Sequence, residues 1–115
     1  MQYVLLIYSN KDVSDGWDHL SQDEQKAVLG EYGTIFQTPG VTGGAQLEPV
    51  TTATTVRVQD GRTLTADGPF AETKEVLGGY FLLEADNIDK ALEIAARIPA
   101  ARMGGAIEVR PLVAM

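Results

Sequence analysis

A chain of 115 residues, of which 44% are hydrophobic, can bury one core, so we expect one domain over residues 1–115. Its formal net charge of −7 repels phosphate backbones and anionic lipids, which argues against nucleic acid and membrane surfaces as partners. The sequence has no cysteine, no apolar run long enough to span a bilayer and no signal-peptide pattern, and we therefore expect a cytoplasmic protein.

The first part of the chain predicts a strand followed by a helix. Tyr3–Tyr8 is a run of six apolar strand formers, which is typical of a strand buried on both faces. Residues 9–20 are mostly polar and predict a surface loop, in which Trp17 is the exception that needs burial. Ser21 and Glu24 have the spacing of a capping box, so a helix of about four turns should begin at Ser21. Its apolar stripe comprises Val28, Tyr32, Ile35 and Phe36, and Thr38, Pro39 and Gly40 then break the pattern.

The second part predicts a hairpin, three strands and a helix. Alternation over residues 53–58 leads to Asp60 and Gly61, a pair that favours a two-residue hairpin turn. Asn87 is a suitable N-cap for a helix that should end before Pro99. The three strands are expected at residues 46–48, 78–84 and 106–110.

The order of these elements indicates the fold. With the hairpin around residues 53–66 set aside, strand, helix, strand, strand, helix, strand is the order of an α+β ferredoxin-like sandwich. Both helices of such a sandwich cover one face of an antiparallel sheet. The first strand and residues 79–84 nevertheless carry apolar side chains on both faces. We therefore expect a homodimer in which two such sheets pack face to face.

Residues 66–75, Ala-Asp-Gly-Pro-Phe-Ala-Glu-Thr-Lys-Glu, predict a rigid corner between the hairpin and the next strand. Gly68 can take backbone angles closed to other residues, and Pro69 fixes its own φ. A carboxylate held in this turn beside Phe70 could be desolvated enough to act as an acid or base, which makes Asp67 the leading catalytic candidate. The alternative is that Asp67 only caps the turn. The charged residues that follow are more typical of a solvated run than of a site: Glu72, Lys74 and Glu75.

This stretch resembles the DGPF-domain branch of the YCII-related proteins. The resemblance continues through Leu77–Tyr80, Ile98–Arg102 and Ile107–Pro111, so it covers nearly the whole chain. It implies a dimeric α+β barrel, and it implies an extracytoplasmic-function sigma factor as a candidate partner.

The resemblance also bears on catalysis. The main YCII branch uses a histidine and an aspartate as a pair, with the histidine inside the first helix. This sequence has no histidine between Ser21 and Thr38. Tyr32 lies on that helix but cannot be assumed to replace the histidine, and His19 lies before it.

Other residues are weaker site candidates. His19 is the only histidine and would titrate near neutral pH, but its position also suits a surface side chain. Tyr32, Tyr80 and Phe70 could line a ligand pocket, with core and dimer packing as the alternative. Arg110 on the last strand is a candidate to bind an anionic ligand, although strand arginines are usually exposed or ion-paired.

Several kinds of site are not indicated. The paired glycines do not form a phosphate-binding fingerprint, and no histidine, cysteine or carboxylate cluster has metal spacing. No nucleophile motif is present either. From the missing phosphate-binding and metal-binding patterns we expect neither a metal nor a cofactor.

Two functional hypotheses remain, and they leave open whether the protein is an enzyme. The first is a small-molecule binder with a cleft beside Asp67, Phe70 and Tyr80, where general acid–base chemistry is an option. The second is a non-catalytic interaction or regulatory protein, linked to a sigma factor by the resemblance. A concave pocket with converging polar groups would favour the first, and an exposed apolar patch would favour the second.

Overall fold

Six strands and two helices make up the computed structural model, which describes residues 1–10, 17–71 and 73–114. Three single 3₁₀ turns, at Trp17–His19, Val50–Thr52 and Pro99–Ala101, connect them. In chain order the strands and helices are β1 (Gln2–Asn10), α1 (Gln22–Gln37), β2 (Val41–Gln46), β3 (Thr54–Gln59), β4 (Arg62–Asp67), β5 (Glu75–Glu84), α2 (Ile88–Ala96) and β6 (Ala106–Pro111).

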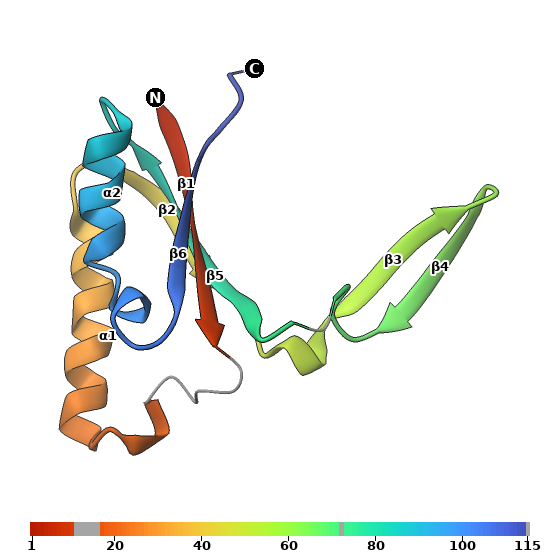
Figure 1. Cartoon of the computed structure of the whole chain (residues 1–115), viewed down its shortest axis with the longest axis horizontal. Coiled ribbons are helices and arrows are strands. Elements are labelled where there is room, and N and C mark those ends of the chain that lie inside the picture. Colours follow the sequence, from red (N-terminus) through yellow and green to blue (C-terminus); the bar gives the residue numbers. More distant parts are fainter. Residues whose placement is uncertain (11–16, 72, 115) are drawn as a thin grey trace.

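A four-stranded antiparallel sheet with the order β2-β5-β1-β6 forms the body of the protein. Both helices lie on the same side of this sheet, and the other side, which we call the helix-free face, carries no helix of the described residues (Figure 1). The predicted α+β class and the predicted order of the six body elements are therefore confirmed. None of the helices in the described ranges is long and apolar enough to cross a membrane.

Alternation along β1 places the core on the helix side of the sheet. Tyr3, Leu5 and Ile7 are buried there, and Leu5 is 0% exposed. Val4 and Leu6, on the helix-free face, are only half-buried. Burial of β1 on both faces was predicted, but within one protomer only one face is fully covered.

The first helix begins as predicted. The Ser21 hydroxyl accepts a hydrogen bond from the Glu24 amide, and the Glu24 carboxylate accepts one from the Ser21 amide, both at 3.1 Å. Val28 and Ile35 are buried, but Phe36 is 50% exposed rather than part of the buried stripe. The reason is that α1 does not press on the sheet along its whole length, because a cavity lies between them.

The position of β2 corrects the sequence analysis, which placed this strand at residues 46–48. The strand instead begins at Val41 and includes Gly43 and Gly44, residues with low strand propensity. A Cβ at Gly44 would lie 2.7 Å from the Tyr80 carbonyl oxygen and 2.8 Å from the Phe81 ring. Only glycine allows β2 to approach β5 this closely, so tertiary pairing outweighs local propensity.

Strands β3 and β4 form a separate two-stranded hairpin, residues 54–67, which we call the arm. Asp60 and Gly61 have φ values of 51° and 75°, as the predicted two-residue turn requires. Figure 1 shows the arm projecting away from the body, on the helix-free side of the sheet. The predicted corner joins β4 to β5, and it is tied to the base of the arm by a 2.7 Å hydrogen bond from the Gly68 amide to the Ala53 carbonyl.

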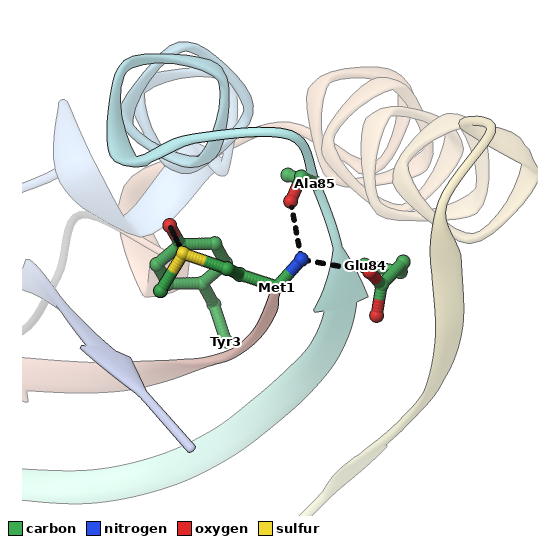
Figure 2. A network of polar contacts seen from close by, with 4 residues as sticks. All are labelled: Met1, Tyr3, Glu84 and Ala85. Carbon is green, nitrogen blue, oxygen red and sulfur yellow. Dashed lines mark hydrogen bonds and ion pairs between the residues drawn. The ribbon is translucent and has the colours of Figure 1, made fainter. Parts of the chain in front are cut away.

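Polar contacts also fix the end of the body sheet where β1 begins and β5 passes into α2. The α-amino group of Met1 donates to the Glu84 carboxylate at 2.8 Å and to the Ala85 carbonyl at 2.9 Å, which secures the start of β1 at the end of β5 (Figure 2). Asn87 caps α2 as predicted, since its side chain accepts a 3.0 Å hydrogen bond from the Lys90 amide.

Candidate functional site

A cavity of about 620 Å³ lies between residues 28–36 of α1 and one end of the sheet. Its helix wall consists of Val28, Leu29, Tyr32 and Phe36, which share one face of α1 because of their spacing. Trp17 borders this wall, so the tryptophan that the sequence analysis expected to be buried finds partial burial at the cavity.

Glycines keep the sheet side of the cavity open. Gly78 and Gly79 lie on its floor and add no side chains to it. Ile7 pairs with Gly79 whereas the next residue, Tyr8, pairs with Leu77, so Gly78 is the extra residue of a β-bulge. A Cβ at Gly79 would lie 2.8 Å from the Ala45 carbonyl oxygen, which shows that glycine is needed there for the approach of β2.

The mouth of the cavity is apolar. Three large apolar side chains line the cavity and are also exposed to solvent: Leu29, Phe36 and Leu47. We call these three residues the cavity mouth. The rings of Phe36 and Phe81 meet edge to face with centroids 4.9 Å apart, so Phe36 packs on the core by one side only.

A few polar side chains stand among these apolar residues. Ser9, Tyr32, Gln46 and Glu48 line the cavity. Hydroxyl, amide and carboxylate groups in an apolar wall can orient a ligand through hydrogen bonds. Within the described part of the chain, no histidine lines the cavity, and no group of three or more His, Asp or Glu side chains could hold a metal ion.

The tyrosines and the histidine named by the sequence analysis are separated. Tyr32 lines the cavity from α1. Tyr80 also borders the cavity, but it pairs with Leu6, and alternation directs its ring to the helix-free face. His19 is exposed in the 3₁₀ turn before α1 and is not part of the cavity lining.

The corner residues lie elsewhere. Asp67 ends β4 and is exposed, and Phe70 is 72% exposed, with the Arg57 guanidinium 4.8 Å from its ring centroid. Neither Asp67 nor Phe70 lines the cavity, so one protomer does not bring them together with the Tyr80 ring. Glu72 falls outside the described residues.

Arg110 is also distant from the cavity lining. It pairs with Val4 across the sheet, on the helix-free face, and its Nε donates to the Glu108 carboxylate at 3.1 Å. This hydrogen bond, together with the charge of Glu108, raises the pKa of Arg110 above its ordinary value. Tyr8 donates a hydrogen bond to the same carboxylate at 3.4 Å. Because Glu108 already binds Arg110, an anionic ligand would have to compete with Glu108 for the guanidinium.

Gln46 and Glu48 line the cavity without having been predicted there, and for Trp17 the sequence indicated only a need for burial. An isolated tryptophan in a polar stretch was the available signal for a nearby apolar surface. Gln46 and Glu48 carry no such signal, because their proximity to α1 depends on the path of the chain after β2.

Three comparisons relate the chain to known proteins. The solved structure of 5-chloro-2-hydroxyhydroquinone dehydrochlorinase from Burkholderia phenoliruptrix AC1100, in complex with 2,5-dihydroxybenzoquinone, is 16% identical with a TM-score of 0.49, covering 98% of this chain and 94% of that chain. An uncharacterised protein of Rhizobium meliloti (strain 1021) is 37% identical over 117 residues, which cover 97% of this chain and 92% of that protein. A sequence model described as the YCII-related domain matches residues 1–115, and this chain therefore belongs to the YCII-related family.

Proposed function

We propose that this protein binds a small molecule with an apolar body in the cavity between α1 and the sheet. The observation that carries the proposal is a cavity of about 620 Å³ with a mostly apolar lining and a few polar side chains. Ligand pockets commonly have volumes of about 300–1,000 Å³ and this kind of lining. We place the ligand against the α1 wall rather than in the predicted cleft beside Asp67 and Phe70.

Acid–base chemistry in this cavity would use the ionisable groups that border it. Glu48 and Tyr32 are the candidates that one protomer supplies, since a general acid or base must come within hydrogen-bond reach of the substrate. A catalytic role for Asp67 stays a prediction. Such a role would require that the corner of one protomer lie beside the cavity of another protomer.

We also propose a homodimer of the DGPF type, in which ferredoxin-like sheets pack face to face as in a dimeric α+β barrel. Half-buried apolar side chains on the helix-free face support this, namely Val4, Leu6, Tyr80 and Leu82. An antiparallel sheet that faces water on one side usually carries polar residues there. A cytoplasmic location stays a prediction.

A fluorescence titration tests the ligand site. Trp17 is the only tryptophan and borders the cavity, so it should sensitise the emission of anilinonaphthalene sulfonate bound there. A Cβ at Gly78 would meet no atom closer than 3.9 Å, so Gly78→Val should fold normally while its side chain fills the floor. We expect this substitution to weaken dye binding by about tenfold or more, which corresponds to about 1.4 kcal/mol. Unchanged sensitised emission in a folded Gly78→Val protein would show that the dye does not use this cavity.

Conservative substitutions test the polar groups. Tyr32→Phe removes a hydroxyl from the cavity, and Tyr8→Phe, on the helix-free face, is the matched control. For any ligand found by thermal-shift screening, Tyr32→Phe should reduce the ligand-induced rise in Tm more than Tyr8→Phe does.

Asp67→Ala should abolish the ligand-induced rise in Tm and leave the dimer intact if Asp67 takes part in binding. Loss of the dimer or of folding would instead assign Asp67 a structural role.

The second candidate function, a protein-interaction module, is favoured by one observation. The arm exposes apolar side chains that the described residues of one protomer leave largely uncovered, including Val56 and Val58. Gel filtration with an extracytoplasmic-function sigma factor from the same organism would test it. Co-elution that is lost when both valines are changed to serine would support this function, whereas separate elution would exclude that partner.

A further inference from the structure

The arm lacks the packing that an isolated hairpin needs. Val58 is 68% exposed, Val56 is 60% exposed, and no helix or strand of the described body packs along β3 or β4. A two-stranded hairpin alone is marginally stable in water, and three strands or a packing surface are normally required. The arm therefore needs a surface that its own protomer does not provide.

The dimensions of the chain lead to the same conclusion. Its accessible surface is 8036 Å², whereas a compact monomer of this mass would expose about 6,100 Å². The difference of about 1,900 Å² exceeds the roughly 800 Å² that each partner buries in a standard interface. The radius of gyration is 16.1 Å, compared with about 13 Å for a compact chain of this length. A second copy of the chain can cover this excess surface.

The position of the arm indicates where it would lie on that second copy. It leaves the body beside Val50, at the edge of the cavity, and extends on the helix-free side (Figure 1). A partner sheet packed on the helix-free face would stand on the same side as the arm. Stacked sheets are about 10 Å apart, whereas strands of six residues extend about 20 Å. The arm is thus long enough to pass the partner's sheet and reach its helix layer, where the cavity opens.

The two faces of the arm differ in charge, and this difference indicates which face would contact the second copy. Val56 and Val58 share one face with Thr63 and Thr65, and this face has no charge before Asp67 at its base. Arg57 and Arg62 lie on the opposite face. Burying the uncharged face against apolar side chains costs no desolvated charge, which suits it to the cavity mouth.

We propose that the arm of one protomer packs its valine face on the cavity mouth of a second copy and closes the second copy's cavity. The inference rests on the proposed function of that cavity as the ligand site. In a two-fold dimer the contact is reciprocal, so each cavity is closed by the other chain and is incomplete in a single protomer.

Site-directed cross-linking tests the contact directly, because the natural chain has no cysteine. Differently tagged chains, one carrying Val58→Cys and the other Leu29→Cys or Leu47→Cys, are refolded together and treated with a short bismaleimide. We expect a covalent species that contains both tags. Glu93→Cys on α2, 69% exposed and outside the cavity lining, is the matched control and should not cross-link.

A second measurement reads the cavity itself. Val56→Ser combined with Val58→Ser should shift Trp17 emission to longer wavelength, because the mouth opens to water, whereas Arg62→Ser on the other face of the arm should not. Dimers that form without cross-links at either mouth position, and with Trp17 emission unchanged in the double variant, would overturn the inference. Cross-linking without dye binding would leave the arm contact established and would refute only the proposed ligand site.

Discussion

Changing glycine to alanine should have opposite effects on stability at two positions of this protein. A Cβ at Gly44 would lie within 3 Å of a carbonyl oxygen of β5 and of the buried Phe81 ring. Neither neighbour is a flexible chain end, so β2 must move away from β5. We expect Gly44→Ala to lower the free energy of unfolding by about 1–3 kcal/mol, which is typical of overpacking.

At Gly33, an exposed position within α1, a Cβ meets nothing within 4 Å. Gly33→Ala should therefore raise the free energy of unfolding by about 0.5–1 kcal/mol.

Thermal and urea unfolding, followed by far-UV circular dichroism at one protein concentration, would measure both effects. A separation of about 2–3 kcal/mol between the two variants corresponds to roughly 10 °C in Tm for a domain of this size. Fixing the protein concentration matters because dimer stability depends on it. A Gly44→Ala protein as stable as the natural chain would contradict the close β2–β5 pairing and, with it, the corrected position of β2.

Three further effects follow from single side chains. Leu5→Ala should lower the free energy of unfolding in urea by about 2–5 kcal/mol, because Leu5 is fully buried. Leu92 is half-exposed, so Leu92→Ala should lower it much less. Equal losses of unfolding free energy in the two variants would refute the assigned core. Asn87→Ala should lower the unfolding free energy by about 1 kcal/mol through loss of the α2 cap, and a neutral result would argue against that cap. The hydrogen bond from the Ser21 amide lowers the pKa of Glu24 in the folded protein, so its stabilising effect is present above the unfolded pKa and is lost as pH falls through the folded value. Urea midpoints from about pH 6 to about pH 3 should therefore fall more for the natural chain than for Glu24→Gln, and parallel curves would contradict this.

Local signals in the sequence were sufficient for most of the elements. The capping box at Ser21, the cap at Asn87 and the turn at Asp60 and Gly61 each depend on a few neighbouring residues, and the structure confirms all three. Apolar patterning likewise identified β1, β5 and β6, because alternation is a property of the strand itself. Together these elements sufficed for the α+β class and the order of the body elements.

The candidate site could be predicted only in part. Tyr32 lines the cavity, at a position that its helical spacing made visible in the sequence, and its part in binding a ligand stays a prediction. Asp67 and Phe70 were grouped with Tyr80 because they are close in sequence, but the direction of the arm separates them from the cavity in one protomer. That direction depends on how the corner leaves β4, which no periodic pattern encodes.

By itself, the sequence determined the local conformations, the helix caps, the hairpin turn and the side chains available for one core. Tertiary structure alone decided the position of β2, the cavity beneath α1 and the exposure of the arm. The physical reason is that each of these depends on an approach between distant segments. Gly44 and Gly79 permit that approach of β2 to β5, and without a side chain at Gly78 the space beneath α1 remains open.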